Sequence, residues 1–233
     1  MADPTTPAWL ERANRLALTS TLLATTVHEV NNALQVISGS AEMLSPASGP
    51  DIIGRRSDAI GAHARRASAL LAELSSFARD DQAPSAHLDL VQVAQRALAM
   101  RQYSLARLKL ASSFDVSGDA RMVTASARQI MQIALNLLVN AEQALAHQPG
   151  GRITVSVDGS GRQVVLTVED DGPGIAPDAV AKLFVPGALA SPTHLGIGLA
   201  VAKSMAEGLK GTIVYAPRET GGSRFTLTLP ATQ

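Results

Sequence analysis

Hydrophobic positions in the first third of the chain recur in steps of four and three residues, a spacing typical of long helices that pack side by side. One such series begins at Leu16 and comprises Leu16, Ser20, Leu23, Val27, Val30, Leu34, Ile37, Ala41 and Leu44. A second series comprises Ile53, Ile60, Ala64, Ala67, Leu71, Leu74 and Ala78. The two series predict helices over residues 16–44 and 52–79, joined by the Pro- and Gly-containing turn 45–51.

Two long helices joined by a short turn form an antiparallel hairpin. A single hairpin has too little apolar surface to be stable alone, whereas two hairpins build a four-helix bundle. We therefore expect a homodimer through this hairpin. The alternative is a monomer whose hairpin packs on the rest of the chain.

The pattern changes after a polar linker at residues 80–87, because strands now mix with helices. Helices are expected over 88–102, 126–146 and 198–207, and strands over 108–115, 121–125, 152–157, 163–169, 212–216 and 223–229. Ser126 and Gln129 could form a capping box at the start of the second of these helices. Because the strands and helices do not alternate strictly, we expect an α+β sandwich with helices on one face of a sheet. The predicted domains are 1–84 and 85–233.

Composition narrows the functional classes. Lys and Arg number 20 and Asp and Glu also 20, so nothing suggests a nucleic-acid groove or a polybasic membrane surface. The absence of cysteine excludes disulfides and thiolate chemistry. Prolines and glycines interrupt the uncharged stretch 183–202 too often for a membrane span, and the first residues lack the apolar run of a signal peptide. We therefore expect a cytoplasmic protein with no membrane segment and no nucleic-acid partner.

The first candidate for chemistry is His28. It lies immediately beside the heptad series, so on a helix it faces solvent at the edge of the apolar stripe. Asn32 follows four residues later on the same face, whereas Glu29 points about 100° away. An imidazole at such an edge could serve as a nucleophile, and the alternative is an ordinary solvated surface histidine.

The second candidate is a pair of amides on the helix predicted over 126–146. Asn136 and Asn140 share one face of an otherwise apolar helix. Asparagine is a poor residue for a helix interior, and a buried amide is costly unless it finds partners. The pair therefore indicates a binding site, and the alternative is a solvated helix edge.

Two glycine-containing segments complete the candidates. In 169–175 (EDDGPGI), Gly172 and Gly174 let the backbone approach a flat ligand, and Asp170 could accept a hydrogen bond from the amine of adenine; the alternative is a surface turn. In 195–200 (LGIGLA), Gly196 and Gly198 precede a helix whose N-terminus suits phosphate. The second motif is weak alone, since it lacks the preceding strand of a dinucleotide-binding fingerprint.

The order and spacing of these motifs are more specific than any one of them. Asn-x3-Asn, Asp-x-Gly-x-Gly and then Gly-x-Gly-Leu at the head of a helix resemble the Bergerat-type ATP-binding fold. Preceded by His-Glu-x-x-Asn on a helical hairpin, the set resembles the catalytic core of a sensor histidine kinase, most closely the nitrogen- and oxygen-sensing branch. The resemblance covers nearly all of residues 15–230. It implies a dimerisation and phosphoacceptor hairpin (1–84) followed by a catalytic ATP-binding domain of α+β sandwich type (85–233).

The resemblance also implies roles for single residues. His28 would be the phosphoacceptor, Glu29 the base that holds its ring and takes its proton, and Asn32 the residue that positions water when the phosphorylated partner is dephosphorylated. Asn140 would coordinate Mg²⁺, and Asn136 would help to hold metal and phosphates. The remaining implied ATP contacts are Asp170 with the adenine amine, Gly172 and Gly174 beside it, and Gly196, Gly198 and Leu199 at the phosphates. The implied partner is the receiver domain of a response regulator.

The sequence departs from this family pattern at three places. Ala33 stands where the family commonly has proline, so a kink in the acceptor helix is not expected. The segment 184–195, which would be the ATP lid, contains no Lys or Arg, and His194 replaces a glycine there. Residues 141–143 add no phosphate-binding cation either. These departures leave a second hypothesis open, namely a dimeric histidine phosphotransfer protein whose ATPase-like domain does not turn over ATP.

Overall fold

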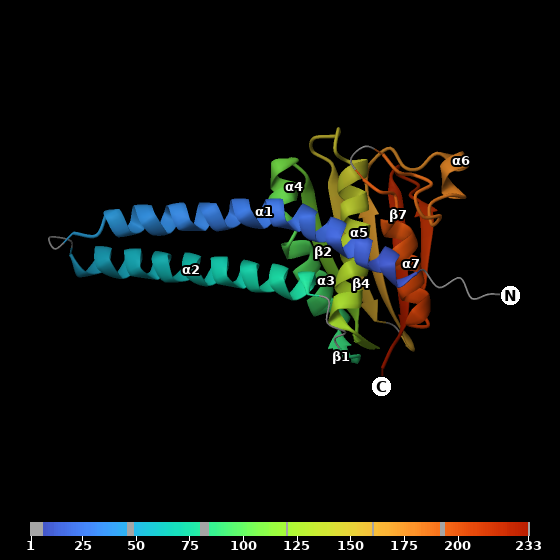
Figure 1. Cartoon of the computed structure of the whole chain (residues 1–233), viewed down its shortest axis with the longest axis horizontal. Helices are drawn as coiled ribbons and strands as arrows, with labels where there is room; N and C mark the ends of the chain where they lie inside the picture. The colour runs from blue at the N-terminus through green and yellow to red at the C-terminus, as the bar shows by residue number, and fades with distance from the viewer. Residues whose placement is uncertain are drawn as a thin grey trace. The chain divides into compact units, whose positions relative to one another are not determined.

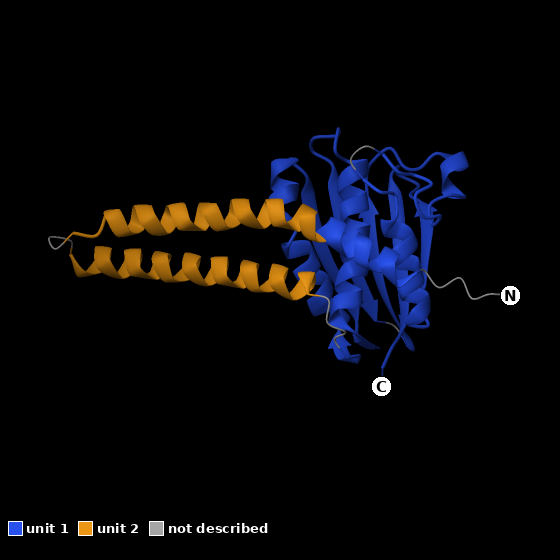
Figure 2. Ribbon diagram, in the orientation of Figure 1, with its two compact units in different colours: residues 1–18, 81–233 blue, residues 19–80 orange. Residues whose placement is uncertain are grey.

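A computed structural model describes residues 7–45, 49–79, 84–119, 121–159, 161–191 and 194–232 (Figure 1). The chain divides into two compact units, one formed by residues 1–18 together with 81–233 and the other by residues 19–80 (Figure 2). The first 18 residues therefore group with the second part of the chain, although the sequence places them in a domain 1–84. Assigning separate functions to 1–84 and 85–233 remains a prediction.

The predicted helical hairpin is confirmed. Helix α1 spans Ala8–Glu42 and helix α2 spans Pro50–Ala78. Gly49 takes the N-cap position of α2 and Pro50 its first turn, where proline removes no needed hydrogen bond. Helix α1 contains no proline and continues without a break past Ala33. Part of the predicted turn, residues 46–48, lies outside the described residues.

The predicted heptad series lies largely on the surface of the single chain. Leu23, Val27 and Leu34 are each about half exposed, at 51%, 48% and 49%. In the unit formed by residues 19–80, called the hairpin unit below, the buried positions of α1 are instead Leu22, Thr25, Thr26, Glu29, Ala33 and Ser40. Ile52, Ile53 and Leu71 of α2 are exposed as well. The hairpin therefore carries apolar positions on both helices that a single chain leaves open.

The unit formed by residues 1–18 and 81–233 contains a mixed five-stranded sheet in the order β2-β4-β5-β7-β6. Its strands are β2 (Ala111–Gly118), β4 (Arg152–Gly159), β5 (Gln163–Asp170), β6 (Thr212–Pro217) and β7 (Ser223–Pro230). Strands β2 and β4 pair in parallel, and the other neighbours pair antiparallel. A separate two-stranded sheet joins β1 (Ala86–Asp89) to β3 (Met122–Ala125). The predicted strands are thus present, but β2 and β3, adjacent along the chain, belong to different sheets.

Three helices pack on the five-stranded sheet: α3 (Leu90–Ala99), α5 (Ala127–Ala144) and α7 (Gly198–Gly208) (Figure 1). Two short helices, α4 (Gln102–Arg107) and α6 (Pro177–Val180), lie in connections. Strands β4 and β5 alternate between buried and half-exposed residues, so one face of the sheet meets the apolar side of α5. This arrangement confirms the predicted α+β sandwich.

Two details of the prediction are wrong. The helix expected over 88–102 is present as the shorter α3, because Leu88 and Asp89 belong to β1 and α3 ends at Ala99, while the separate helix α4 was not predicted. Asp89 accepts a hydrogen bond from the backbone N–H of Val91 as the N-cap of α3. The capping box at Ser126 does not form, because the Ser126 hydroxyl is buried where β3 runs into α5 and makes no bond to the helix.

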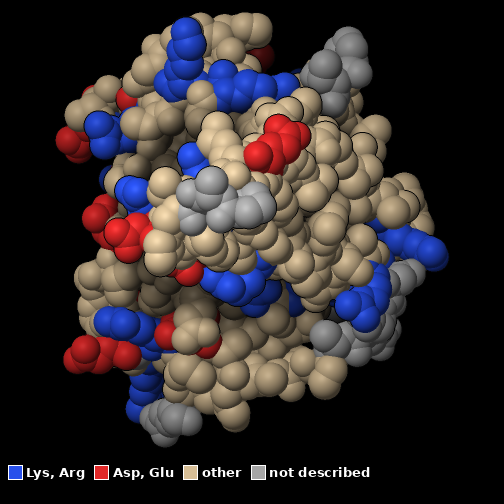
Figure 3. Space-filling view, turned by 90° about the vertical axis from the view of Figure 1, so that its left-hand side faces the viewer, with Lys and Arg blue, Asp and Glu red and all other residues tan. Residues whose placement is uncertain are grey.

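The surface is mixed in charge. On the face that Figure 3 shows, Lys and Arg side chains lie in several small groups with Asp and Glu between them. This distribution agrees with the equal numbers of cationic and acidic residues in the sequence. Among the described residues, no helix combines the length and the hydropathy that a membrane crossing requires.

Candidate functional site

Asp170, the last residue of strand β5, lies in the interior of the domain. The alternation that buries Val164, Leu166 and Val168 also buries Asp170, whose exposed fraction is 1%. Its Oδ1 accepts hydrogen bonds from the backbone N–H groups of Gly172 (2.9 Å) and Ser223 (3.3 Å). Burial raises the pKa of the Asp170 carboxyl, and these two hydrogen bonds oppose that effect only in part. A buried carboxyl group with a shifted pKa is typical of a binding or catalytic site.

The loop after β5 leaves little room for side chains. A Cβ atom at Gly172 would come within 2.8 Å of Asp170 Oδ1 and 3.5 Å of the Ala144 side chain at the end of α5. Asp171, next to it, turns away and accepts a hydrogen bond from the Arg152 backbone N–H at 2.6 Å. The glycine therefore lets the backbone pass between α5 and the carboxylate, and its expected role beside a flat ligand stays a prediction.

Asn136 and Asn140 lie on the face of α5 that Ala144 continues, at intervals of four residues. Asn136 is buried, and its amide is hydrogen-bonded to the amide of Asn14 from α1. Asn140 is half-buried, and its side-chain amide makes no hydrogen bond within the described part of the chain. Of the two amides, only Asn140 is thus open to a ligand as the structure stands.

The turn before α7 is equally tight. Gly196 has a φ of 63°, and a Cβ there would lie 2.6 Å from the backbone nitrogen of Ala190. A Cβ at Gly198, the first residue of α7, would lie 2.8 Å from Asn136 Oδ1. Helix α5 therefore contacts both glycine segments, at Asn136 and, two turns later, at Ala144, and Asn140 lies between these contacts.

The first turn of α7 has no side-chain cap. Ile197 takes the N-cap position without a side-chain hydrogen bond, so the backbone N–H groups of this turn keep their capacity to bind an anion. Leu199 is buried and anchors the turn in the core. This geometry fits the phosphate role that the resemblance implies for the segment.

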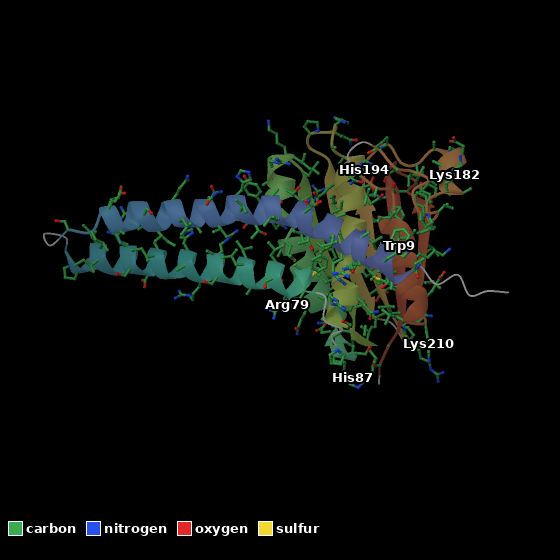
Figure 4. The ribbon with its side chains drawn as sticks, in the orientation of Figure 1. Trp9, Arg79, His87, Lys182, His194 and Lys210 are labelled. Carbon is green, nitrogen blue, oxygen red and sulfur yellow. The ribbon has the colours of Figure 1, made fainter. Side chains whose placement is uncertain are left out.

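The segment 184–195 starts from an anchored residue. Leu183 is buried, and Lys203 of α7 stacks on the ring of Phe184, 5.0 Å from its centroid. Near the far end, His194 Nδ1 lies 2.8 Å from the Ser191 hydroxyl, within an isolated β-bridge between the two residues. Figure 4 labels His194 together with Lys182, the lysine that precedes this segment. The segment 184–195 itself contains no Lys or Arg.

The phosphoacceptor candidates belong to the hairpin unit. His28 and Asn32 are exposed on α1, whereas Glu29 is buried. Glu29 Oε2 receives a hydrogen bond from Arg66 Nη2 of α2 at 3.0 Å. The carboxylate of Glu29 is thus directed to the second helix of the hairpin, as its divergence from His28 around the helix suggests.

The described residues suit a Mg²⁺-bound nucleotide. Among them no group of three or more His, Cys, Asp or Glu side chains could hold a metal ion. A magnesium ion here would therefore depend on the Asn140 carbonyl, water and the oxygens of the phosphates, a ligand set that Mg²⁺ accepts. The open amide of Asn140 and the buried carboxylate of Asp170 provide the two kinds of acceptor that the metal and an adenine amine require.

The sequence interpretation missed four residues that contact the site. In the interior, Asn14 is hydrogen-bonded to Asn136, and Gln132 donates a hydrogen bond to Asn14. Ser223 and Arg218 contact Asp170 from the β6–β7 hairpin. Gln132 sits one turn before Asn136 on the same face of α5, and this spacing is a signal that could have been used. The contacts of the other three cross between distant segments and leave no local pattern.

Comparison with known proteins gives a consistent result. Residues 125–233 match the family described as histidine kinase-, DNA gyrase B-, and HSP90-like ATPase. The chain is 31% identical to the C4-dicarboxylate transport sensor protein DctS of Rhodobacter capsulatus over 96% of its own length and 35% of that protein. It is 29% identical to the sensor histidine kinase ZraS of Escherichia coli K12 over 95% of its length and 47% of that protein. The chain thus spans a third to a half of these relatives.

Solved structures show the same fold. The catalytic domain of histidine kinase ThkA superposes with a TM-score of 0.58 at 22% identity, covering 65% of this chain and all of that domain. ThkA in complex with the response regulator protein TrrA gives a TM-score of 0.56 at 21% identity over 95% of this chain and 64% of that one. These findings identify residues 125–233 as a domain of the family described as histidine kinase-, DNA gyrase B-, and HSP90-like ATPase, in a chain that is similar over most of its length to sensor histidine kinases.

Proposed function

We propose that the chain phosphorylates its own His28 from Mg²⁺–ATP and passes the phosphoryl group to an aspartate of a response-regulator receiver domain. The observation that carries the proposal is the carboxylate of Asp170, buried in the ATPase domain with a raised pKa. Burying an ionisable group is costly, and a domain kept only for its shape gains nothing from it. The relatives named sensor histidine kinases support the same conclusion.

In this proposal the ATPase unit, formed by residues 1–18 and 81–233, binds and orients the nucleotide. Asp170 accepts a hydrogen bond from the adenine amine, and Gly172 and Gly174 keep the wall beside it free of side chains. The Asn140 carbonyl holds Mg²⁺, which when bound neutralises charge on the phosphates. The uncapped first turn of α7, from Gly198, donates backbone N–H groups to the phosphates.

His28 carries the chemical step. An imidazole nitrogen forms a bond to the terminal phosphorus while the bond from that phosphorus to the leaving ADP oxygen breaks. The ring proton then passes to Glu29 or to water. For Glu29 to take it, its carboxylate must exchange its contact with Arg66 for one with His28. Phosphoryl transfer depends mainly on positioning and charge neutralisation, so an exposed neutral imidazole requires orientation more than activation.

The partners follow from the hairpin unit. The exposed apolar positions Leu23, Val27 and Leu34 would be covered by the hairpin of a second copy, which gives a four-helix bundle. The receiver domain of a cytoplasmic response regulator would approach the exposed His28. Histidine kinase ThkA, whose fold is similar, has been solved in complex with the response regulator protein TrrA. Asn32, one turn after His28, would position water when the phosphorylated regulator is dephosphorylated.

The second candidate function is a dimeric histidine phosphotransfer protein that relays phosphate through His28 without using ATP. One observation favours it: segment 184–195 carries no cation that could hold the terminal phosphate. In the relay, His28 would accept phosphate from one receiver domain and return it to another. The buried Asp170 would then have no ligand.

Labelling with ATP that carries a radioactive γ-phosphate separates the two functions. A kinase incorporates label in the presence of Mg²⁺, and His28→Gln abolishes labelling while nucleotide binding persists. Asn32→Ala is expected to label normally but to dephosphorylate the regulator more slowly. A folded dimer that takes no label from ATP, yet accepts phosphate from a phosphorylated receiver domain, would establish the relay instead.

A further inference from the structure

The turn between β6 and β7 is tied to the end of β5 by one side chain. Arg218 Nη1 donates hydrogen bonds to the backbone carbonyl of Asp170 at 2.8 Å and to that of Gly221 at 3.3 Å. The guanidinium thus joins the strand that carries the buried carboxylate to the turn that follows β6. The Arg218 backbone N–H closes the turn on the Gly222 carbonyl at 3.2 Å.

The turn itself reaches the Asp170 carboxylate. Gly222 has a φ of 95°, and a side chain there would overlap the Asp170 carbonyl, so the two backbones are in close contact. The next residue, Ser223, donates its backbone N–H to Asp170 Oδ1 at 3.3 Å. Any loosening of the turn therefore removes a hydrogen bond from the carboxylate.

Glu169 orients the guanidinium. Its Oε2 lies 3.7 Å from Arg218 Nε, and its Oε1 bonds to Arg224, which faces it across the β5–β7 pair. Two arginines thus share this carboxylate. Only Arg218 also contacts Asp170, and it is the more buried of the two, with 23% of its side chain exposed against 51% for Arg224.

We propose that Arg218 is a positioning residue for adenine recognition: by fastening the β6–β7 turn to β5, it holds Ser223 against Asp170 and fixes the orientation of the Asp170 carboxylate. This inference rests on the proposed function, in which that carboxylate accepts a hydrogen bond from the adenine amine. Selectivity for adenine then depends on a turn that lies about 50 residues after the aspartate in the sequence.

The test compares two arginines that share one partner. Wild type, Arg218→Gln, Arg218→Lys and Arg224→Gln are titrated with Mg²⁺–ATP and with Mg²⁺–GTP, and Asp170→Asn serves as the reference for lost adenine recognition. Arg218→Gln is expected to weaken ATP binding by about tenfold, the equivalent of one hydrogen bond. Its preference for ATP over GTP falls with it, because phosphate binding, common to both nucleotides, is unchanged. Arg218→Lys restores part of the preference, and Arg224→Gln retains it.

Each result has a definite reading. The ATP/GTP preference is a ratio within one folded sample, so a loss of stability alone does not alter it. A wild-type preference in Arg218→Gln, or an equal loss in Arg224→Gln, would overturn the positioning role while the proposed function stands. A wild type that binds no ATP, or that Asp170→Asn matches in affinity, would overturn the proposed adenine recognition and this inference with it.

Discussion

The side-chain amides of Asn14 and Asn136 form a reciprocal pair, each donating to the other over 2.9 Å. Gln132 adds a third amide, which donates to Asn14 Oδ1 at 2.8 Å. All three are buried, with 4%, 5% and 1% exposed. The beginning of α1 is thus held against the helix that carries the proposed Mg²⁺ ligand, through hydrogen bonds that water cannot easily replace.

Removing Asn14 should destabilise the ATPase unit. Asn14→Ala removes both hydrogen bonds between Asn14 and the buried amide of Asn136, at a cost of about 1–3 kcal/mol for each group left unsatisfied, whereas Gln132 keeps its bond to the Glu11 carbonyl. Urea unfolding of the unit should show a lower midpoint with an unchanged slope. Gln35→Ala, a change at an exposed position of the same helix outside the heptad series, is the control. Equal midpoints for the two variants would mean that the amide cluster contributes no stability.

The loop before α7 offers a comparison between two glycines. Gly196 and Gly187 both have positive φ, 63° and 74°, but only a Cβ at Gly196 would meet another atom, whereas Gly187 faces open space. Each alanine variant carries a strain of about 1–2 kcal/mol from its backbone conformation. Gly196→Ala must also displace Ala190, so we expect nucleotide affinity to fall several-fold further than in Gly187→Ala. Matching affinities would exclude a role for this close contact in shaping the phosphate site.

Nucleotide binding should depend on pH through Asp170. Burial raises the pKa of this carboxyl above the usual 3.8, so acidification protonates it earlier than an exposed aspartate. A protonated oxygen donates instead of accepting, and ATP affinity should therefore fall as the pH drops through the raised pKa. Folding stability behaves oppositely, because the folded state favours the protonated form of this group.

Calorimetric titration with ATP from neutral to mildly acidic pH measures this dependence. Asp170→Asn should bind ATP about 10- to 100-fold more weakly, the cost of one charged hydrogen bond, and should lose this component of the pH dependence. Asp171→Asn changes a carboxylate that faces Arg152 and should keep the wild-type profile. A wild-type profile in Asp170→Asn would assign the pH dependence to the nucleotide itself.

A charge in the exposed heptad series should separate the proposed dimer. Leu34 is 49% exposed in the single chain, and two copies would meet at a two-fold axis, so Leu34→Glu places two carboxylates in the interface. Each lost leucine contact removes roughly 2 kcal/mol, and the unpaired charges add to the loss. Sedimentation equilibrium should show a monomer for Leu34→Glu and a dimer for Gln35→Glu on the neighbouring exposed position. A monomeric wild type would contradict the four-helix bundle.

Most of the architecture could be predicted from the sequence because its signals are local. The heptad steps locate α1 and α2, and the alternation in Val164–Val168 locates β5 and its burial of Asp170. Strand β1 was missed because four residues carry too little periodicity, and its partner β3 lies more than 30 residues away. The partners of the site residues could not be predicted for the same reason. The link from Asn14 to Asn136 and that from Arg218 to Asp170 form only when the chain is folded.

The parallel pair of β2 and β4 has a consequence for synthesis of the protein. Strand β2 is an edge strand whose only neighbour in the five-stranded sheet is β4, and the whole of α5 is translated between them. While the ribosome makes this segment, the emerging β2 exposes unsatisfied backbone groups that can pair with another nascent chain. Truncated products that stop before β4 should therefore be the aggregating species, and slow translation through α5 would lengthen the period of risk.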